Sequence, residues 1–270
     1  MNKVFYSVLF VSCFFSLAAS AMESGINQGG LGFLFPDANS FSNPGAFSGE
    51  YGTSIQGAYS RSSATGGDQE FTPSAVYGNG KFGIGAYGSR TATNLTEPTD
   101  AADQIGAAMG VGIIHDKLDF GLGYSRYISA NPANNGVATA SLTLHGAKDM
   151  GPSLGVAFND TFNTNGTSTN GGTVAIGYGF KHNTSIEADA TFLDLSNYKD
   201  VVLGAFVNVG SQMVYLSAGY EYWNEFTFKN EILGRLGFIL GKNVDFSVTA
   251  GDFLETGATL NYGATLRFSF

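Results

Sequence analysis

The chain has 270 residues, a formal net charge of −9, 38 glycines, 13 tyrosines and 23 phenylalanines, and only 13% of its residues are charged. An acidic chain without a cluster of lysine and arginine argues against nucleic acid as a partner. After the first 21 residues there is no run of 18 apolar residues, which excludes a transmembrane helix, yet the charged fraction is about half of the soluble norm.

Residues 1–21 have the features of a secretory signal peptide. Lys3 gives a positive start, residues 4–17 are almost wholly apolar, and Ala19-Ser20-Ala21 offers a small-residue cleavage site. A lipoprotein signal at Cys13 is the alternative, but the apolar run continues past this residue. Cleavage after residue 21 would remove the only cysteine, so we expect a mature chain without disulfides or thiol chemistry.

Residues 22–51 come next and form a segment of their own. They are too numerous for a simple tail and contain an apolar cluster, Leu31, Phe33, Leu34 and Phe35. A segment of this kind can fold into the interior of the structure that follows it. We therefore treat it as a separate element.

From residue 52 onward, apolar and polar residues alternate, which predicts strands with one apolar and one polar face. In KLDFGLGYSR, residues 117–126, every second residue from Leu118 to Tyr124 is apolar, and the residues between are aspartate or glycine. Fourteen segments follow this rule, although twelve strands stay open as an alternative. The segments are 52–62, 70–79, 81–91, 103–114, 117–128, 137–147, 152–161, 172–181, 184–194, 200–209, 212–223, 230–240, 243–252 and 258–270.

The links between these segments alternate in length. Most odd-numbered links are long and polar, such as TATNLTEPTDAA, whereas the even-numbered links are tight, such as GNG and KDMG. This alternation is typical of bacterial outer-membrane barrels. We predict an all-β fold over residues 52–270, a transmembrane antiparallel up-and-down β-barrel. A soluble β-sandwich would have a thin core here, and a β-solenoid would show a repeat of fixed length that the sequence lacks.

The last segment ends on an aromatic residue within a strand pattern. Every second residue from Leu260 to Phe270 is apolar and would form the lipid face of the closing strand. This ending resembles the C-terminal signature of bacterial outer-membrane proteins, which the barrel assembly machinery reads. The resemblance implies Tyr262, Phe268 and Phe270 as the assembly signal, and the bacterial outer membrane as the location.

The stretch PDANSFSNPGAFSGEYG, residues 36–52, is similar to the N-terminal hatch of the long-chain fatty acid transporter (FadL-like) family. Those barrels have fourteen strands and carry an Asn-Pro-Ala motif before the first strand. Asn43 and Pro44 match this motif, and Gly45 stands where alanine is usual. The resemblance implies that residues 22–51 form a plug in the lumen that includes Asn43 and Pro44. An ordinary turn at this Asn-Pro pair is the alternative.

Several charged residues alternate with the apolar positions and should face the lumen. They are Asp119, Glu187, Asp189, Arg235, Asp245 and Arg267. In one interpretation they line a polar path for solutes. In the other they pair with one another and stabilise the barrel.

Three arginines, Arg61, Arg90 and Arg126, share a different pattern. Each falls at the outer end of an upward strand, in register with the lipid-facing residues. A charge on the lipid face is tolerated only near the interface. We expect these guanidinium groups to hold phosphates of lipopolysaccharide; the alternative is that they only extend into water.

The remaining motifs predict no catalytic or metal chemistry. GIGAYG, residues 83–88, has the dinucleotide-binding spacing but lies inside a strand. His115, His145 and His182 fall near separate inner turns, so we expect no metal site and no cofactor.

The sequence therefore favours an outer-membrane channel for passive uptake of small molecules, hydrophobic ones if the hatch resemblance holds, rather than an enzyme. The expected surroundings are outer-membrane lipid and lipopolysaccharide. A general diffusion porin and a non-conducting structural or adhesive surface barrel stay open as alternatives.

Overall fold

The computed structural model describes residues 33–34, 41–49, 51–63, 68–93, 95, 102–114, 117–128, 134–147, 150–163, 166–180, 184–197, 200–211, 213–224, 226, 229–240, 243–255 and 260–270. The predicted signal peptide, residues 1–21, lies outside these residues.

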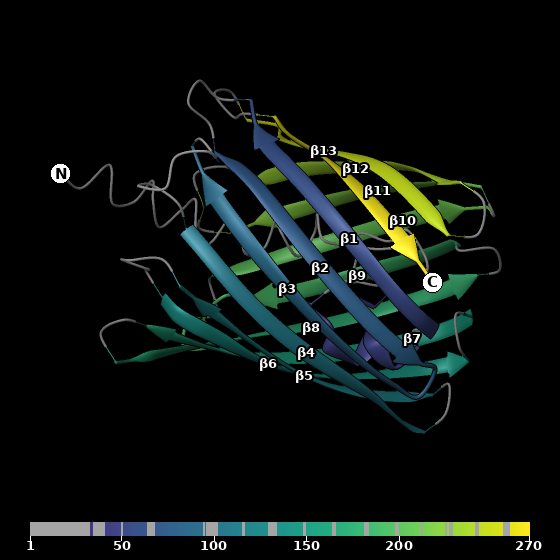
Figure 1. Ribbon diagram of the computed structural model, residues 1–270. Coiled ribbons are helices and arrows are strands. Elements are labelled where there is room, and N and C mark those ends of the chain that lie inside the picture. Colours follow the sequence, from purple (N-terminus) through teal and green to yellow (C-terminus); the bar gives the residue numbers. More distant parts are fainter. Residues whose placement is uncertain are drawn as a thin grey trace.

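Fourteen antiparallel strands close into one barrel (Figure 1). In chain order they are β1 Tyr51–Ser62, β2 Gln69–Asn79, β3 Phe82–Ala92, β4 Ala102–Ile114, β5 Leu118–Tyr127, β6 Asn134–Ala147, β7 Met150–Asn163, β8 Ser168–Phe180, β9 Thr184–Phe192, β10 Val201–Gly210, β11 Val214–Trp223, β12 Asn230–Leu240, β13 Val244–Phe253 and β14 Asn261–Ser269. Each strand pairs with its neighbours in sequence, and β1 pairs with β14. The predicted fold and the count of fourteen are confirmed, because each predicted segment overlaps one strand.

The barrel closes where the end of the chain meets β1. Phe270 N–H donates to Thr53 O at 2.8 Å, and Thr53 N–H donates to Phe270 O at 3.2 Å. Gly52 has a φ of 84°, and a Cβ there would collide with the carbonyl oxygen of Phe270. Glycine is therefore required at this position for two reasons, backbone conformation and space.

The surface of the barrel is apolar outside and polar inside. Outward-facing side chains such as Ile84, Ile176 and Leu216 are exposed, whereas serine, threonine and charged side chains on the opposite faces of the strands are buried. This is the reverse of a water-soluble sheet protein, and it suits an outer face in contact with lipid. The closed barrel leaves no open sheet edge, so neighbouring strands can pair their backbone polar groups with one another instead of with water.

Among the described residues, no helix is long and apolar enough to cross a membrane. The only helix assigned among them is the 3-10 helix η1, Pro44–Gly49. It contacts strands β2 to β6 and lies inside the ring of strands, as the purple coil in Figure 1 shows.

Two large side chains near the outer ends of the strands are buried on the inner face. Trp223 packs there against Phe226 and Phe253. Consecutive strand residues point to opposite faces, so Tyr222 and Trp223 cannot both face lipid. Glu70, near the start of β2, is also buried on the inner face.

Candidate functional site inside the barrel

Two pieces of the N-terminal segment contact the inner wall of the barrel. Residues 41–49 lie against β2 to β6, and residues 33–34 lie against β7, β8 and β9. We call the inward positions of β3 to β8 the small-residue wall, because most of them are glycine, alanine, serine or threonine. The role of residues 22–51 as a plug stays a prediction, and residues 22–32, 35–40 and 50 lie outside the described residues.

Glycines of the small-residue wall make room for the backbone of η1. A Cβ at Gly121 would overlap the backbone at Gly45, and one at Gly83 would overlap the carbonyl oxygen of Phe47. At Gly110 a Cβ would lie 2.9 Å from Ser48 N. Because these obstacles are backbone atoms rather than flexible side chains, any larger residue would displace the helix.

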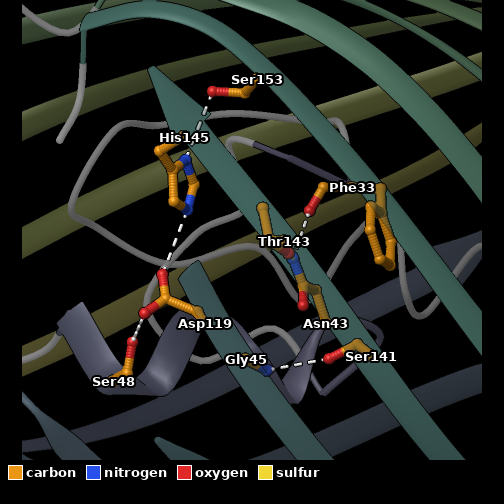
Figure 2. A network of polar contacts seen from close by, with 9 residues as sticks. All are labelled: Phe33, Asn43, Gly45, Ser48, Asp119, Ser141, Thr143, His145 and Ser153. Atoms are coloured by element: carbon orange, nitrogen blue, oxygen red, sulfur yellow. Dashed lines mark hydrogen bonds and ion pairs between the residues drawn. The ribbon is translucent and has the colours of Figure 1, made fainter. Parts of the chain in front are cut away.

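Asn43 and Pro44 lie at the start of η1 and are buried (Figure 2). The side-chain amide of Asn43 donates to Phe33 O at 3.0 Å and to Thr143 Oγ1 at 3.2 Å, so it joins both pieces of the N-terminal segment to β6. Gly45 N–H donates to Ser141 Oγ at 3.0 Å, also on β6. This pair is therefore more than a surface turn, because its amide connects the segment to the wall.

A polar network holds the other end of η1 (Figure 2). Ser48 Oγ donates to Asp119 Oδ1 at 2.6 Å. Asp119 Oδ2 also lies 3.1 Å from His145 Nε2, and His145 Nδ1 lies 3.3 Å from Ser153 Oγ. The network thus links η1 to β5, β6 and β7. Asp119 was expected to face the lumen, but its partners Ser48 and His145 were not predicted.

Residues 33–34 are bound by a carboxylate of β9. Phe33 N–H donates to Glu187 Oε1 at 2.6 Å, and Leu34 N–H donates to both carboxylate oxygens at 2.9 and 3.0 Å. The two apolar side chains pack on Ala157 and Ala175, and a Cβ at Gly155 would lie 2.7 Å from each of them. Glu187 was expected to line the lumen, and it contacts the segment that crosses there.

The opposite side of the barrel is filled by its own side chains. We call the inward positions of β11 to β14 the charged wall. Arg235 is 2% exposed; its Nε and Nη2 donate to Ser247 Oγ at 3.1 and 2.9 Å, and its guanidinium carbon lies 5.4 Å from the centre of the Tyr215 ring. Tyr215 O–H donates to Asp245 Oδ1 at 3.0 Å, and Asp245 lies directly opposite Arg267 across the β13–β14 pair.

Other acidic side chains face inward nearer the outer ends of the strands. Glu221 and Glu231 are directly opposite each other on β11 and β12. Asp189 follows Glu187 on the same face of β9 and accepts a hydrogen bond from the backbone of Gly204. All six charged residues predicted to face the lumen lie on the inner side; whether they contact a solute stays a prediction.

The outer rim carries a further fixed negative charge. In the loop after β9, Ser196 Oγ and N–H donate to Asp194 Oδ1 at 2.7 and 2.8 Å. These hydrogen bonds lower the pKa of Asp194 below its usual range, so this carboxylate stays charged in mildly acidic solution.

The remaining predicted site residues lie outside the lumen. Arg61, Arg90 and Arg126 point outward at the outer ends of β1, β3 and β5. The three aromatic residues of the predicted assembly signal, Tyr262, Phe268 and Phe270, are exposed on the outer face of the closing strand. Their roles in binding and assembly stay predictions.

The inner network includes residues that sequence reasoning did not single out, namely Ser48, Thr143 and Ser153. The available signal was the position of His145 and Asp119 on the polar faces of consecutive strands, which must be neighbours in an up-and-down barrel. In the described part of the chain no group of three or more histidine, cysteine, aspartate or glutamate residues could hold a metal ion. His115 and His182 lie outside that part.

No protein-family model and no curated protein matches the chain. The fold is similar to that of two toluene transporters. TbuX of Ralstonia pickettii matches with a TM-score of 0.54 and 12% identity, over 90% of this chain and 99% of the transporter. TodX of Pseudomonas putida matches with a TM-score of 0.57 and 10% identity, over 93% of this chain and 97% of the transporter.

The outer membrane protein Omp33 of Acinetobacter baumannii has the same fold at 11% identity, with a TM-score of 0.55 over 83% of this chain and 100% of Omp33. Identities this low indicate a shared fold only. The expected resemblance to the long-chain fatty acid transporter family is confirmed at that level.

Proposed function

We propose that the chain is a bacterial outer-membrane channel for passive uptake of small molecules, with residues 22–51 as a plug. The observation that carries the proposal is the hydrogen-bonded contact of residues 33–34 and 41–49 with the inner wall of a closed barrel. Fourteen strands about 4.8 Å apart and tilted about 40° enclose a backbone radius of roughly 13–14 Å, wide enough for both a plug and a path.

The proposed cargo is hydrophobic, and two observations support this choice. TbuX and TodX, which share the fold, are toluene transporters. The wall of this barrel also has an interrupted ladder between β2 and β3: Phe71 pairs with Arg90 and Ser74 pairs with Tyr87, but no pairs join Thr72 and Pro73 to β3.

The interruption has a local cause, since proline has no N–H to donate to the ladder. On the inner face a carboxylate bridges the interruption. Thr72 Oγ1 and Ser89 Oγ donate to Glu70 Oε1 at 3.1 and 2.5 Å, so side chains replace part of the missing backbone pairing. We infer that β2 and β3 separate here more easily than other strand pairs, giving hydrophobic molecules a sideways exit into the membrane.

A general diffusion porin is the second candidate, and the polar inner faces of the strands favour it. The interior of a porin is polar, although the arginine and aspartate side chains of the charged wall are buried here rather than open to water. The two candidates differ in the state of the lumen at rest, which the porin needs open and the plugged channel needs closed.

Conductance in planar bilayers tests the plug. The full mature chain and a variant lacking residues 22–50 would be refolded and compared. We expect silence from the full chain and a large, steady conductance after the deletion. Steady conductance of both forms would favour the porin, and silence of both would favour a structural or adhesive barrel.

Uptake by porin-deficient Gram-negative cells tests the cargo. We expect expression of the full chain to speed entry of the hydrophobic dye N-phenyl-1-naphthylamine, but not hydrolysis of a hydrophilic β-lactam by a periplasmic enzyme. Pro73→Val, which restores a backbone donor, should slow dye entry. Ala75→Val is the control, because it places the same side chain on the same outward face of β2 where the β2–β3 ladder is intact. Equal dye entry in both variants would contradict the sideways exit.

A further inference from the structure

The basic residues of the barrel wall have an uneven distribution. Within the fourteen strands, which the structure describes, there is no lysine, and the permanently cationic side chains are five arginines. Two of the five, Arg235 and Arg267, face the lumen and are buried. The other three, Arg61, Arg90 and Arg126, face outward among apolar side chains.

The three outward arginines lie at one level near the outer edge of the lipid-facing surface. Arg61 and Arg126 are the next-to-last residues of β1 and β5, and Arg90 lies two residues before the end of β3. All three strands run toward the long outer loops. A charge at this depth costs little, whereas the same charge at mid-membrane costs about 2–4 kcal/mol.

The ladder registers bring the three arginines into one sector. They come from alternate strands, whose backbones lie roughly 10 Å apart across the wall. Phe71 of β2 lies opposite Arg90, and Ile105 of β4 lies opposite Arg126. Both apolar side chains are exposed, at 45% and 51%. The sector thus alternates between cationic and apolar side chains.

The rest of the outer belt has no outward arginine, and its one cation among the described residues is Lys229, which is exposed directly before β12. At the outer ends of β6 to β14, in the strands as described, the outward polar residues are neutral or acidic. They include Asp160, Asn170, Tyr220, Asn230 and Asp252. If the barrel only needed charge at the membrane interface, cations would occur all around it. The grouping of arginines on β1 to β5 therefore needs a more specific explanation.

An internal ion pair accounts for only part of this charge. Arg90 Nε lies 3.9 Å from Asp103 Oδ1, with side chains 37% and 35% exposed. Exposed pairs of this kind contribute little to stability, about 0–1 kcal/mol. Arg61 and Arg126 lie opposite Tyr262, Gln69 and Ile105, which carry no charge. The outward residues of the described strands in this sector therefore keep a net positive charge.

Lysine would serve equally well if the only requirement were to extend a charge from lipid into water. The exclusive use of arginine indicates a planar, bidentate contact, which guanidinium makes with phosphate. We propose that Arg61, Arg90 and Arg126 bind the phosphate groups of a phosphorylated glycolipid of the outer leaflet, namely lipopolysaccharide, whose acyl chains pack on Phe71 and Ile105. This inference rests on the proposed outer-membrane location.

Binding of purified lipid A to the refolded full mature chain in detergent tests the proposal. Correct folding of each variant would be checked by its heat-modifiable gel mobility. The triple variant R61Q/R90Q/R126Q should bind bisphosphorylated lipid A at least tenfold more weakly, since charge-assisted hydrogen bonds are the strong ones. The control K81Q/K117Q removes two exposed charges at the inner turns and should bind normally.

Other probes separate the possible ligands. Dephosphorylated lipid A should bind the wild-type barrel as weakly as bisphosphorylated lipid A binds the triple variant. Competition by millimolar inorganic phosphate would overturn the lipid assignment in favour of a soluble anion. Equal binding by the triple variant would overturn the site itself, and full recovery in R61K/R90K/R126K would overturn the bidentate geometry. Conductance of the triple variant should equal that of the wild type. Failure of the lipid-binding proposal would therefore leave the channel proposal unaffected.

Discussion

The small-residue wall and the charged wall both have inward glycines, but different groups occupy the space that these glycines leave. In the small-residue wall, Gly83 and Gly121 leave space that the backbone of η1 occupies. In the charged wall, Gly237 leaves space that the ring of Tyr215 occupies. An inward glycine therefore does not by itself indicate a binding surface, because a neighbouring side chain can fill the space that it leaves.

The walls also differ in how their polar groups are satisfied. Thr143, Asp119 and Ser141 bond with the N-terminal segment, which is far from them in sequence, and so does Glu187 on the neighbouring strand β9. Arg235 bonds with Ser247 of the adjacent strand β13, and Asp245 bonds with Tyr215 two strands away on β11. We therefore expect changes in the first group to open the lumen, and changes in the second group to weaken the barrel without opening it.

The largest effect is expected from Gly121→Ala. The added Cβ would overlap backbone atoms of residues 44 and 45, so η1 must leave the wall. We expect the silent channel to show large, steady conductance in planar bilayers. Gly112→Ala is the matched control on β4, since its Cβ would meet nothing closer than Asp119 Oδ1 at 3.4 Å. Silence of both variants would show that the two walls do not differ in this way.

A smaller opening is expected from Glu187→Gln. This change leaves one acceptor oxygen, so at least one of the three hydrogen bonds from Phe33 and Leu34 is lost and the others become neutral, which should weaken the contact by about 1.5–3 kcal/mol. Brief openings should become frequent in single-channel records. Asp189→Asn removes a charge from the same face of β9, and there the openings should stay rare.

Gly237→Ala should give the reverse pattern in the charged wall. The Cβ would push the Tyr215 ring away from Asp245 and Arg235, and overpacking of this kind costs about 1–3 kcal/mol. We expect the urea midpoint of the refolded barrel to fall while conductance stays silent. Open-channel conductance in this variant would contradict the assignment of the two walls.

The smallest effect is expected from His145→Asn. The change removes the contact with Asp119 Oδ2, but the bond from Ser48 to the other carboxylate oxygen remains. We expect a loss of stability of about 0.5–1.5 kcal/mol in urea unfolding. Ser153→Ala, which removes only the contact with His145 Nδ1, should lose no more than this.

Sequence periodicity was sufficient for the barrel but not for its interior. Alternation placed all fourteen strands, and the neighbouring pairs followed from up-and-down order. It also placed Asp119, Glu187 and Arg235 on the inner side, since residues two apart share a face. The same rule applied to Trp223 would have placed it inside, where the structure has it, because Tyr222 beside it faces outward.

The partners of the inward residues needed the tertiary structure. Glu187 bonds with residues more than 150 positions away, and Asn43 with one 100 positions away. Such contacts depend on which strands face each other across the lumen and on how deeply the N-terminal segment enters it. The sequence by itself determined the strands, their order and their two faces, because these depend on local alternation. Only closure of the barrel decided which glycines meet a backbone and which meet a side chain, because that depends on distances between segments remote in the chain.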